Sequence, residues 1–194
     1  MNLALFDTAG ATFSKCRSYR YNLYRRWSSA PAALFVMLNP STADEIENDP
    51  TIERCQRRAL DMGYGGIAVV NLFALRATDP RVLYRATDPV GPDNDVAIVT
   101  TAKVAGIVIC GWEMHGHLHG RGEHVLALLV NEACVTPHAL RLNADRTPCH
   151  PLYLPYNAKP FPLRRANDYG HPPFPRRQLR EIPPLRRASD FESS

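Results

Sequence analysis

The sequence predicts an α/β fold, a three-layer α/β/α sandwich around a mostly parallel four-stranded sheet. Three observations favour it. Apolar runs of strand length recur along the chain, and they lack the polar alternation of strands that face water on one side. Helical patterns with capping residues separate these runs. Strands and helices therefore alternate along the chain, and this order requires crossover connections that place the helices on the faces of a parallel sheet.

The first expected element is a strand over about residues 16–27. Tyr21 and Leu23 alternate with Arg20 and Asn22, as in a half-buried strand. We therefore expect an edge strand here. The buried strands follow at residues 32–38, 66–72, 105–112 and 138–143.

Three helices are expected between the buried strands. The first runs between Asp49, a good N-cap followed by Pro50, and Gly63, which can end a helix in the left-handed conformation. Its apolar positions share one face, so its charged residues are expected to point outward: Glu53, Arg54, Arg57 and Arg58. The second starts at Asp93 or Asn94 and the third covers residues 123–133.

The composition divides the chain at about residue 163. Residues 1–163 are expected to form one domain. Residues 164–194 are rich in Pro and Arg and are predicted to be a flexible tail. That tail contains seven Arg and four acidic residues, so it accounts for +3 of the net charge of +4. A mild excess of this kind permits an anionic partner without requiring one.

Cysteine usage and hydropathy indicate a cytoplasmic protein. The five cysteines are widely spaced and form no Cys-x-x-Cys pair, which argues against a disulfide framework and a finger-type zinc site. No apolar run approaches the roughly 20 residues that span a bilayer. We expect no membrane contact, and a monomer is favoured.

Polar residues follow three of the expected buried strands. Asn39 and Asn71 come at the ends of the first and second, and His150 follows the fourth. Because parallel strands end at the same edge of a sheet, these three side chains are expected to converge on one pocket.

The motifs around these residues resemble the uracil-DNA glycosylase superfamily. They read "MLNPS" at 37–41, "VVNLFALR" at 69–76 and "CHPLYL" at 149–154, in the order of that superfamily. The stretch "NPSTAD…DPT…VVNLFALRATDP" also resembles, more closely, a family of bacterial and phage proteins with no assigned activity. The first resemblance implies a glycosylase-like fold and cleavage of an N-glycosidic bond, with DNA or a modified nucleotide as partner.

The resemblance also implies roles for individual residues. Asn39 would hold a water beneath the sugar carbon. Asn71 would read the edge of a flipped-out uracil-like or modified pyrimidine, and His150 would donate a hydrogen bond to the leaving base. Pro40 and Ser41 would contact the base. No metal or cofactor is required. Independently of the resemblance, the positive charge of three arginines makes them candidates for binding phosphates, with solubility as the alternative: Arg76, Arg164 and Arg165.

One departure leaves alternatives open. Where the fastest uracil enzymes carry an acid, this chain has Asn39, and a neutral amide is no strong general base. Asp44 or Asp49 would supply a carboxylate to the same loop, although Asp49 is equally explained as a helix cap. The alternative is a module that binds a nucleobase, nucleotide or nucleic acid without cleaving it. A third possibility is metal-dependent hydrolysis through the His-rich loop, which contains His115, His117 and His119.

Overall fold

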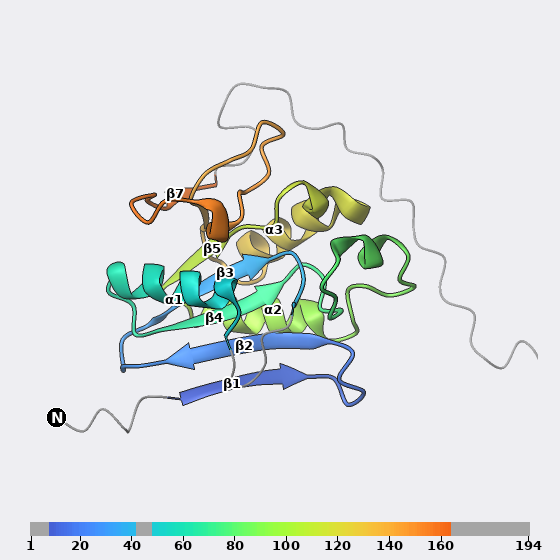
Figure 1. The fold of residues 1–194 in the computed structure, drawn as a ribbon, viewed down its shortest axis with the longest axis horizontal. Helices are drawn as coiled ribbons and strands as arrows, with labels where there is room; N and C mark the ends of the chain where they lie inside the picture. Colours follow the sequence, from blue (N-terminus) through green and yellow to red (C-terminus); the bar gives the residue numbers. More distant parts are fainter. Residues whose placement is uncertain (1–7, 42–47, 164–194) are drawn as a thin grey trace, which may run out of the picture. The chain divides into compact units, whose positions relative to one another are not determined.

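The computed structural model describes residues 8–41 and 48–163. Three residues of the expected site lie outside these ranges: Asp44, Arg164 and Arg165. The described residues form an α/β fold with a seven-stranded mixed sheet and three α-helices (Figure 1). Among them, no helix is both long and apolar enough to cross a membrane.

The sheet has the strand order β1-β2-β4-β3-β5-β6-β7. The four strands β4, β3, β5 and β6 are parallel, and β1, β2 and β7 join antiparallel. The strands are β1 (Thr8–Phe13), β2 (Arg20–Arg26), β3 (Ala32–Met37), β4 (Gly66–Asn71), β5 (Ile107–Cys110), β6 (Pro137–Ala139) and β7 (Phe161–Pro162).

The expected sheet was therefore right in its parallel centre and wrong in its extent. The strand expected at 16–27 is β2, and it is not an edge strand, because β1 pairs with its outer side. The other addition is the two-residue β7. Neither addition contains a buried residue, so both lack the continuous apolar pattern that reveals a buried strand.

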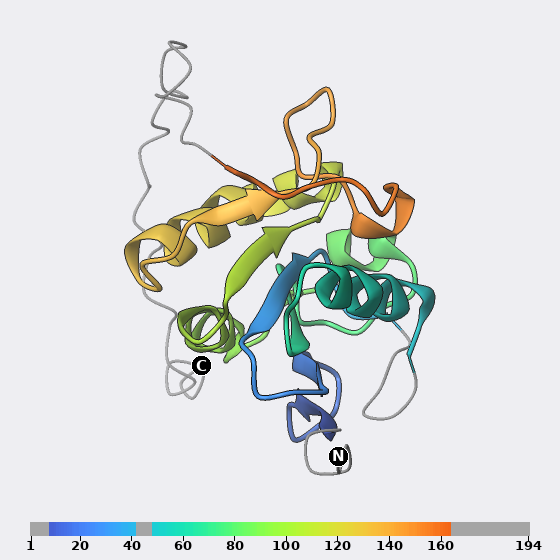
Figure 2. The ribbon, with the colours of Figure 1, turned by 90° about the vertical axis from the view of Figure 1, so that its left-hand side faces the viewer.

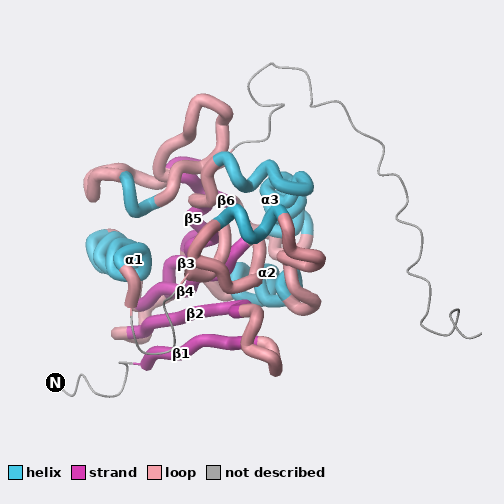
Figure 3. Tube along the Cα trace, turned by 45° about the vertical axis from the view of Figure 1, so that its right-hand side comes forward, coloured by secondary structure: helices cyan, strands magenta, loops and turns pink. Residues whose placement is uncertain are grey.

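Helices cover both faces of the sheet (Figures 2 and 3). One face packs against α1 (Pro50–Asp61), and the other packs against α2 (Asn94–Lys103) and α3 (Arg121–Asn131). Consecutive residues of β3 divide between the two cores: Phe35 faces the α1 side and Val36 the α2 and α3 side. This explains why β3 is apolar at every position.

The side chains of α1 only partly follow the expected pattern. Asp49 caps the helix by accepting a hydrogen bond from the Ile52 amide at 2.9 Å. Glu53 and Arg57 are exposed as expected. The prediction for Arg58 was wrong: only 2% of its surface is exposed. Its guanidinium instead binds backbone carbonyl oxygens of residues 151–155, an interaction that no helical periodicity can reveal.

A bulge in β2 turns one more arginine inward. Thr12 pairs with Asn22 and Phe13 with Arg20, so Tyr21 is an extra residue on β2. A bulge of this kind breaks the alternation of side chains, so the residues on its two sides no longer follow one pattern. Arg20 thereby lines the cavity described below, and it is 2% exposed.

Candidate functional site

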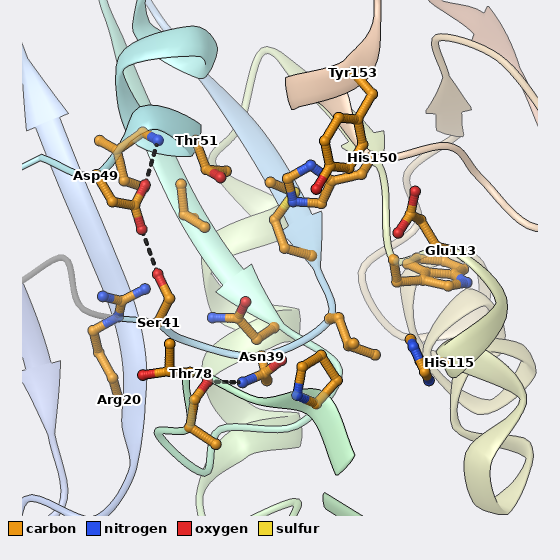
Figure 4. A pocket seen from close by; sticks show the side chains of 18 residues that line it. Arg20, Asn39, Ser41, Asp49, Thr51, Thr78, Glu113, His115, His150 and Tyr153 are labelled. Carbon is orange, nitrogen blue, oxygen red and sulfur yellow. Dashed lines mark hydrogen bonds between the residues drawn. The ribbon is translucent and has the colours of Figure 1, made fainter. Parts of the chain in front are cut away.

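A cavity of about 230 Å³ lies at the carboxyl ends of the parallel strands. Asn39 follows β3, Asn71 ends β4, Glu113 follows β5, and His150 lies beyond β6; all four line the cavity. Figure 4 shows Asp49, Ser41 and Arg20 on one side of the cavity, with Glu113 and His150 on the other. The structure thus brings together the three side chains that the sequence places 32 and 79 residues apart.

The topology explains the position of the cavity. From β3 the chain crosses through α1 to β4 on one side, and from β4 it crosses through α2 to β5 on the other side of β3. The helices that follow the neighbouring strands β3 and β5, α1 and α3, lie on opposite faces, so the loops after β3 and β5 separate. Open α/β sheets bind ligands at such a switch point.

The side chain of Asn71 is buried with an unused donor. The residue is 1% exposed, and its Nδ2 has no hydrogen-bond partner among the described residues. Its backbone is fixed, because Asn94 donates from Nδ2 to the carbonyl oxygens of Asn71 and Leu72, at 3.0 Å each. Arg121 also donates to the Leu72 carbonyl, at 2.7 Å. A buried donor without a partner costs stability, so its presence at this strand end points to a ligand that accepts from it.

The imidazole of His150 has a defined tautomer. Nδ1 accepts a hydrogen bond from the Leu152 amide at 3.2 Å, which caps the 3-10 turn η4 (Pro151–Tyr153). The proton of the neutral ring therefore resides on Nε2, a donor. Burial lowers the pKa of His150 below its usual 6.5, against the opposing effects of the Glu113 and Asp49 carboxylates. The ring is neutral at pH 7.

The position of His150 depends on α1. Arg58 donates to the carbonyl oxygens of Pro151, Leu154 and Pro155, at 3.3, 2.6 and 3.1 Å. Burial lowers the pKa of Arg58. Arg54 donates to the same Leu154 carbonyl. These two arginines thus hold the turn that carries His150 against the helix.

Asn39 connects two walls of the cavity. Its Nδ2 donates to the carbonyl oxygen of Ala77 at 2.6 Å and to that of Pro40 at 3.2 Å. Its Oδ1 accepts no hydrogen bond from any described residue, so it can hold a water. Pro40 itself is buried and does not line the cavity.

The carboxylate of Asp49 is fully engaged in local structure. One oxygen accepts from the Ile52 amide, and the other accepts from the Ser41 hydroxyl. Ser41 and Asp49 both line the cavity, and their contact joins the two ends of the loop between β3 and α1. Asp49 is therefore a helix cap whose outer surface reaches the cavity.

Sequence reasoning missed Glu113. The residue lines the cavity and has φ +57° and ψ −165°, a region essentially limited to glycine. No described residue donates a hydrogen bond to its carboxylate. The signal was weak, because "CGWEMHG" was read only as the end of a strand before a His-rich loop. Arg20 was missed too, since its strand was expected to lie at the sheet edge.

Arg76, a candidate for phosphate binding, does not line the cavity. Arg76 donates to the Arg17 carbonyl at 3.4 Å and its guanidinium lies 5.2 Å from the centre of the Phe13 ring. Beyond His150, Tyr153 lines the cavity and is 69% exposed, whereas Leu152 does not line it.

The three histidines of the His-rich loop do not converge. His115 lines the cavity and its Nδ1 lies 3.0 Å from the Tyr84 hydroxyl. His117 lies 3.5 Å from the Asp145 carboxylate, and His119 has a left-handed backbone. Among residues 8–41 and 48–163, no three His, Cys, Asp or Glu side chains lie where they can hold one metal ion.

Comparison with known proteins gives one match. Residues 20–152 match the sequence model of a family described as "Protein of unknown function (DUF1643)". Neither a curated protein nor a solved structure matches the chain. The expected relationship to a family without an assigned activity is confirmed, and no homologue links the chain to uracil-DNA glycosylases. Because the match covers well over half of the 194 residues, the chain belongs to the DUF1643 family.

Proposed function

We propose that the cavity binds a nucleobase and that the protein hydrolyses the N-glycosidic bond of a uracil-like or modified pyrimidine. The unpaired Nδ2 of Asn71 is the observation that carries this proposal. An amide offers a donor and an acceptor side by side, and the edge of a pyrimidine presents the complementary pair. A ligand that accepts from Nδ2 removes the cost of burying that group.

His150 supplies a second donor to the same ligand. Its Nε2 is protonated because Nδ1 is engaged with the Leu152 amide. A neutral imidazole can donate to a carbonyl oxygen of the base as negative charge develops there. One well-placed donor of this kind is worth about 3 kcal/mol of transition-state stabilisation.

The size of the cavity suits a small ligand. Pockets for drug-sized molecules occupy about 300–1,000 Å³. The 230 Å³ observed here suits one ring and part of a sugar better than a dinucleotide. We therefore propose that a single base enters the cavity, from DNA or as part of a modified nucleotide. The same proposal includes the type of fold: a glycosylase-like three-layer sandwich whose parallel strands end at this cavity.

A second candidate is a module that binds the base without cleaving it. Asn39 favours this function, because its amide nitrogen already binds the Ala77 carbonyl and its oxygen is too weak a base to take a proton from water. Under this proposal Asn71 and His150 recognise the base and no bond is broken.

An assay for the release of free base from a set of test compounds, called the panel below, distinguishes the two functions. The panel contains single-stranded and duplex DNA, and free nucleosides, each with uracil or a modified pyrimidine. Cleavage predicts free base and a sugar with a new hydroxyl group, lost in Asn71→Ala and His150→Ala. Calorimetry with the same compounds measures binding. Saturable binding that depends on Asn71, without release, supports the binding module; neither binding nor release contradicts both proposals.

A further inference from the structure

We infer that Glu113 is the general base that activates the attacking water in this cavity. The inference rests on the proposed hydrolysis and adds the group that Asn39 cannot provide. It is argued from the backbone of Glu113, from its position beside His150, and from the engagement of the other carboxylate.

The backbone of Glu113 is held in a conformation that side chains avoid. A non-glycine residue at φ +57° and ψ −165° is strained, and such strain gathers at functional sites. The chain closes tightly after it: the Gly116 amide donates to the Glu113 carbonyl at 3.1 Å. A Cβ on Gly116 would lie 2.1 Å from Trp112 Cδ1, so the loop can fold over the indole only with glycine there.

Backbone contacts fix the loop of Glu113 to the loop of His150. The Glu113 amide donates to the Pro148 carbonyl at 2.9 Å. Gly111 approaches Pro151 so closely that a Cβ would lie 2.6 Å from the proline Cδ. The two loops therefore place the carboxylate and the imidazole on the same side of the cavity (Figure 4).

Asp49 is the other described carboxylate that lines the cavity, and it already serves as the cap of α1. Both of its oxygens accept hydrogen bonds, from the Ile52 amide and the Ser41 hydroxyl. The carboxylate of Glu113 accepts none from the described residues. Each hydrogen bond that a carboxylate accepts stabilises its charged form and weakens it as a base, which favours Glu113 over Asp49.

The reaction is balanced with water as the second reactant. Glu113 takes a proton from water as the water oxygen bonds to the anomeric carbon. The C–N bond breaks and its electron pair leaves with the base, whose carbonyl oxygen accepts the hydrogen bond from His150 Nε2. The base then takes up a proton from solvent, and Glu113 returns its proton to solvent.

The test compares the whole protein with its Glu113→Gln variant on the most reactive compound of the panel. Gln keeps the size and hydrogen-bonding ability of the side chain and removes its basicity. We expect release to fall by about 10²–10⁴-fold, the usual contribution of a general base, while the affinity for the free base changes less than threefold. Glu53→Gln, on the exposed face of α1, is the matched control and should release base at the wild-type rate.

Chemical rescue separates a base from a structural role. Added formate should restore part of the activity of Glu113→Ala and leave Asn71→Ala inactive. If the wild type releases base and Glu113→Gln keeps more than a tenth of its rate, the assignment of Glu113 is wrong and the proposed function stands. If the wild type binds base through Asn71 and releases none, the proposed hydrolysis and this assignment both fail.

Discussion

One nitrogen atom of Asn94 holds two successive carbonyl groups, those of Asn71 and Leu72. Asn94 is the first residue of α2 and is fully buried, so it fixes the end of β4 relative to the next crossover helix. The strand end is rigid at the point where the side chain of Asn71 has an unused donor. This pairing of a fixed backbone with an unsatisfied side chain is typical of a preorganised binding site.

Replacing Asn71 by leucine should separate stability from function. The change removes a buried, unpaired donor, so we expect the free energy of unfolding to rise by about 1 kcal/mol while base binding is lost. Asn143→Leu is the matched control. The Asn143 amide donates to the Thr147 hydroxyl and accepts from the Cys149 thiol, so its loss should lower stability. Urea denaturation measures the free energy of unfolding of both variants. A loss of stability in Asn71→Leu would mean that the Asn71 amide has a structural role.

Replacing Arg58 by methionine should destabilise the turn that carries His150. Three carbonyl groups, two of them in buried hydrogen bonds, lose a charged donor, and we expect a loss of about 2–3 kcal/mol together with weaker base binding. Arg57→Met, one position earlier and exposed, should change stability by less than about 0.5 kcal/mol. Equal effects of the two substitutions in thermal unfolding would contradict the role given to Arg58.

The lowered pKa of His150 links stability to pH. The unfolded chain binds a proton near pH 6.5, whereas the folded protein resists it. The contribution of His150 to the free energy of unfolding is therefore complete above pH 6.5. It is lost as the pH falls toward the lower pKa that His150 has in the folded protein, by at most about 1.4 kcal/mol per pH unit. His150→Gln should make this slope shallower between pH 7.5 and 5. An unchanged slope in urea titrations would place the pKa of His150 at its ordinary value.

Replacing Glu113 by glycine should relieve backbone strain. Residues held in such sparsely populated regions cost about 1–3 kcal/mol, so Glu113→Gly should be more stable than wild type by about 1 kcal/mol, even though glycine adds freedom to the unfolded chain. His119→Gly is the control, because its φ of +55° and ψ of +22° lie in the milder left-handed region. For His119→Gly we expect a smaller gain in stability than for Glu113→Gly, and no loss of base binding or release.

A gain in His119→Gly equal to that in Glu113→Gly would remove the argument that strain is concentrated at the cavity. A loss of stability in Glu113→Gly would show that the carboxylate has a partner within the fold. Calorimetric unfolding of the three proteins at one pH distinguishes these results.

The parallel centre of the sheet was predictable because burial on both faces leaves a continuous apolar run, as in residues 32–38. The caps of α1 were predictable because Asp49 and Pro50 act locally. The position of β2 inside the sheet was not predictable, since its alternation is the same whether or not β1 pairs beside it.

The candidate site was predictable only where residues follow recognised strand ends. Asn39, Asn71 and His150 meet because parallel strands end at one edge, a rule that sequence order alone supplies. Glu113 and Arg20 depend on a positive φ angle and on a bulge, neither of which has a sequence signature here. The buried position of Arg58 depends on carbonyl groups 93–97 residues away.

The central claim is that the side chains of Asn71 and His150 bind the same ligand. Side-chain NMR tests this claim most directly. Titration of the protein with free pyrimidine bases is followed at the Asn71 Nδ2 amide and at the His150 ring nitrogens. The account predicts that at least one base shifts both sets of resonances with the same saturation curve, and that the Nε2 tautomer is present before binding. No response at either residue to any base, or responses with different saturation curves, would contradict it.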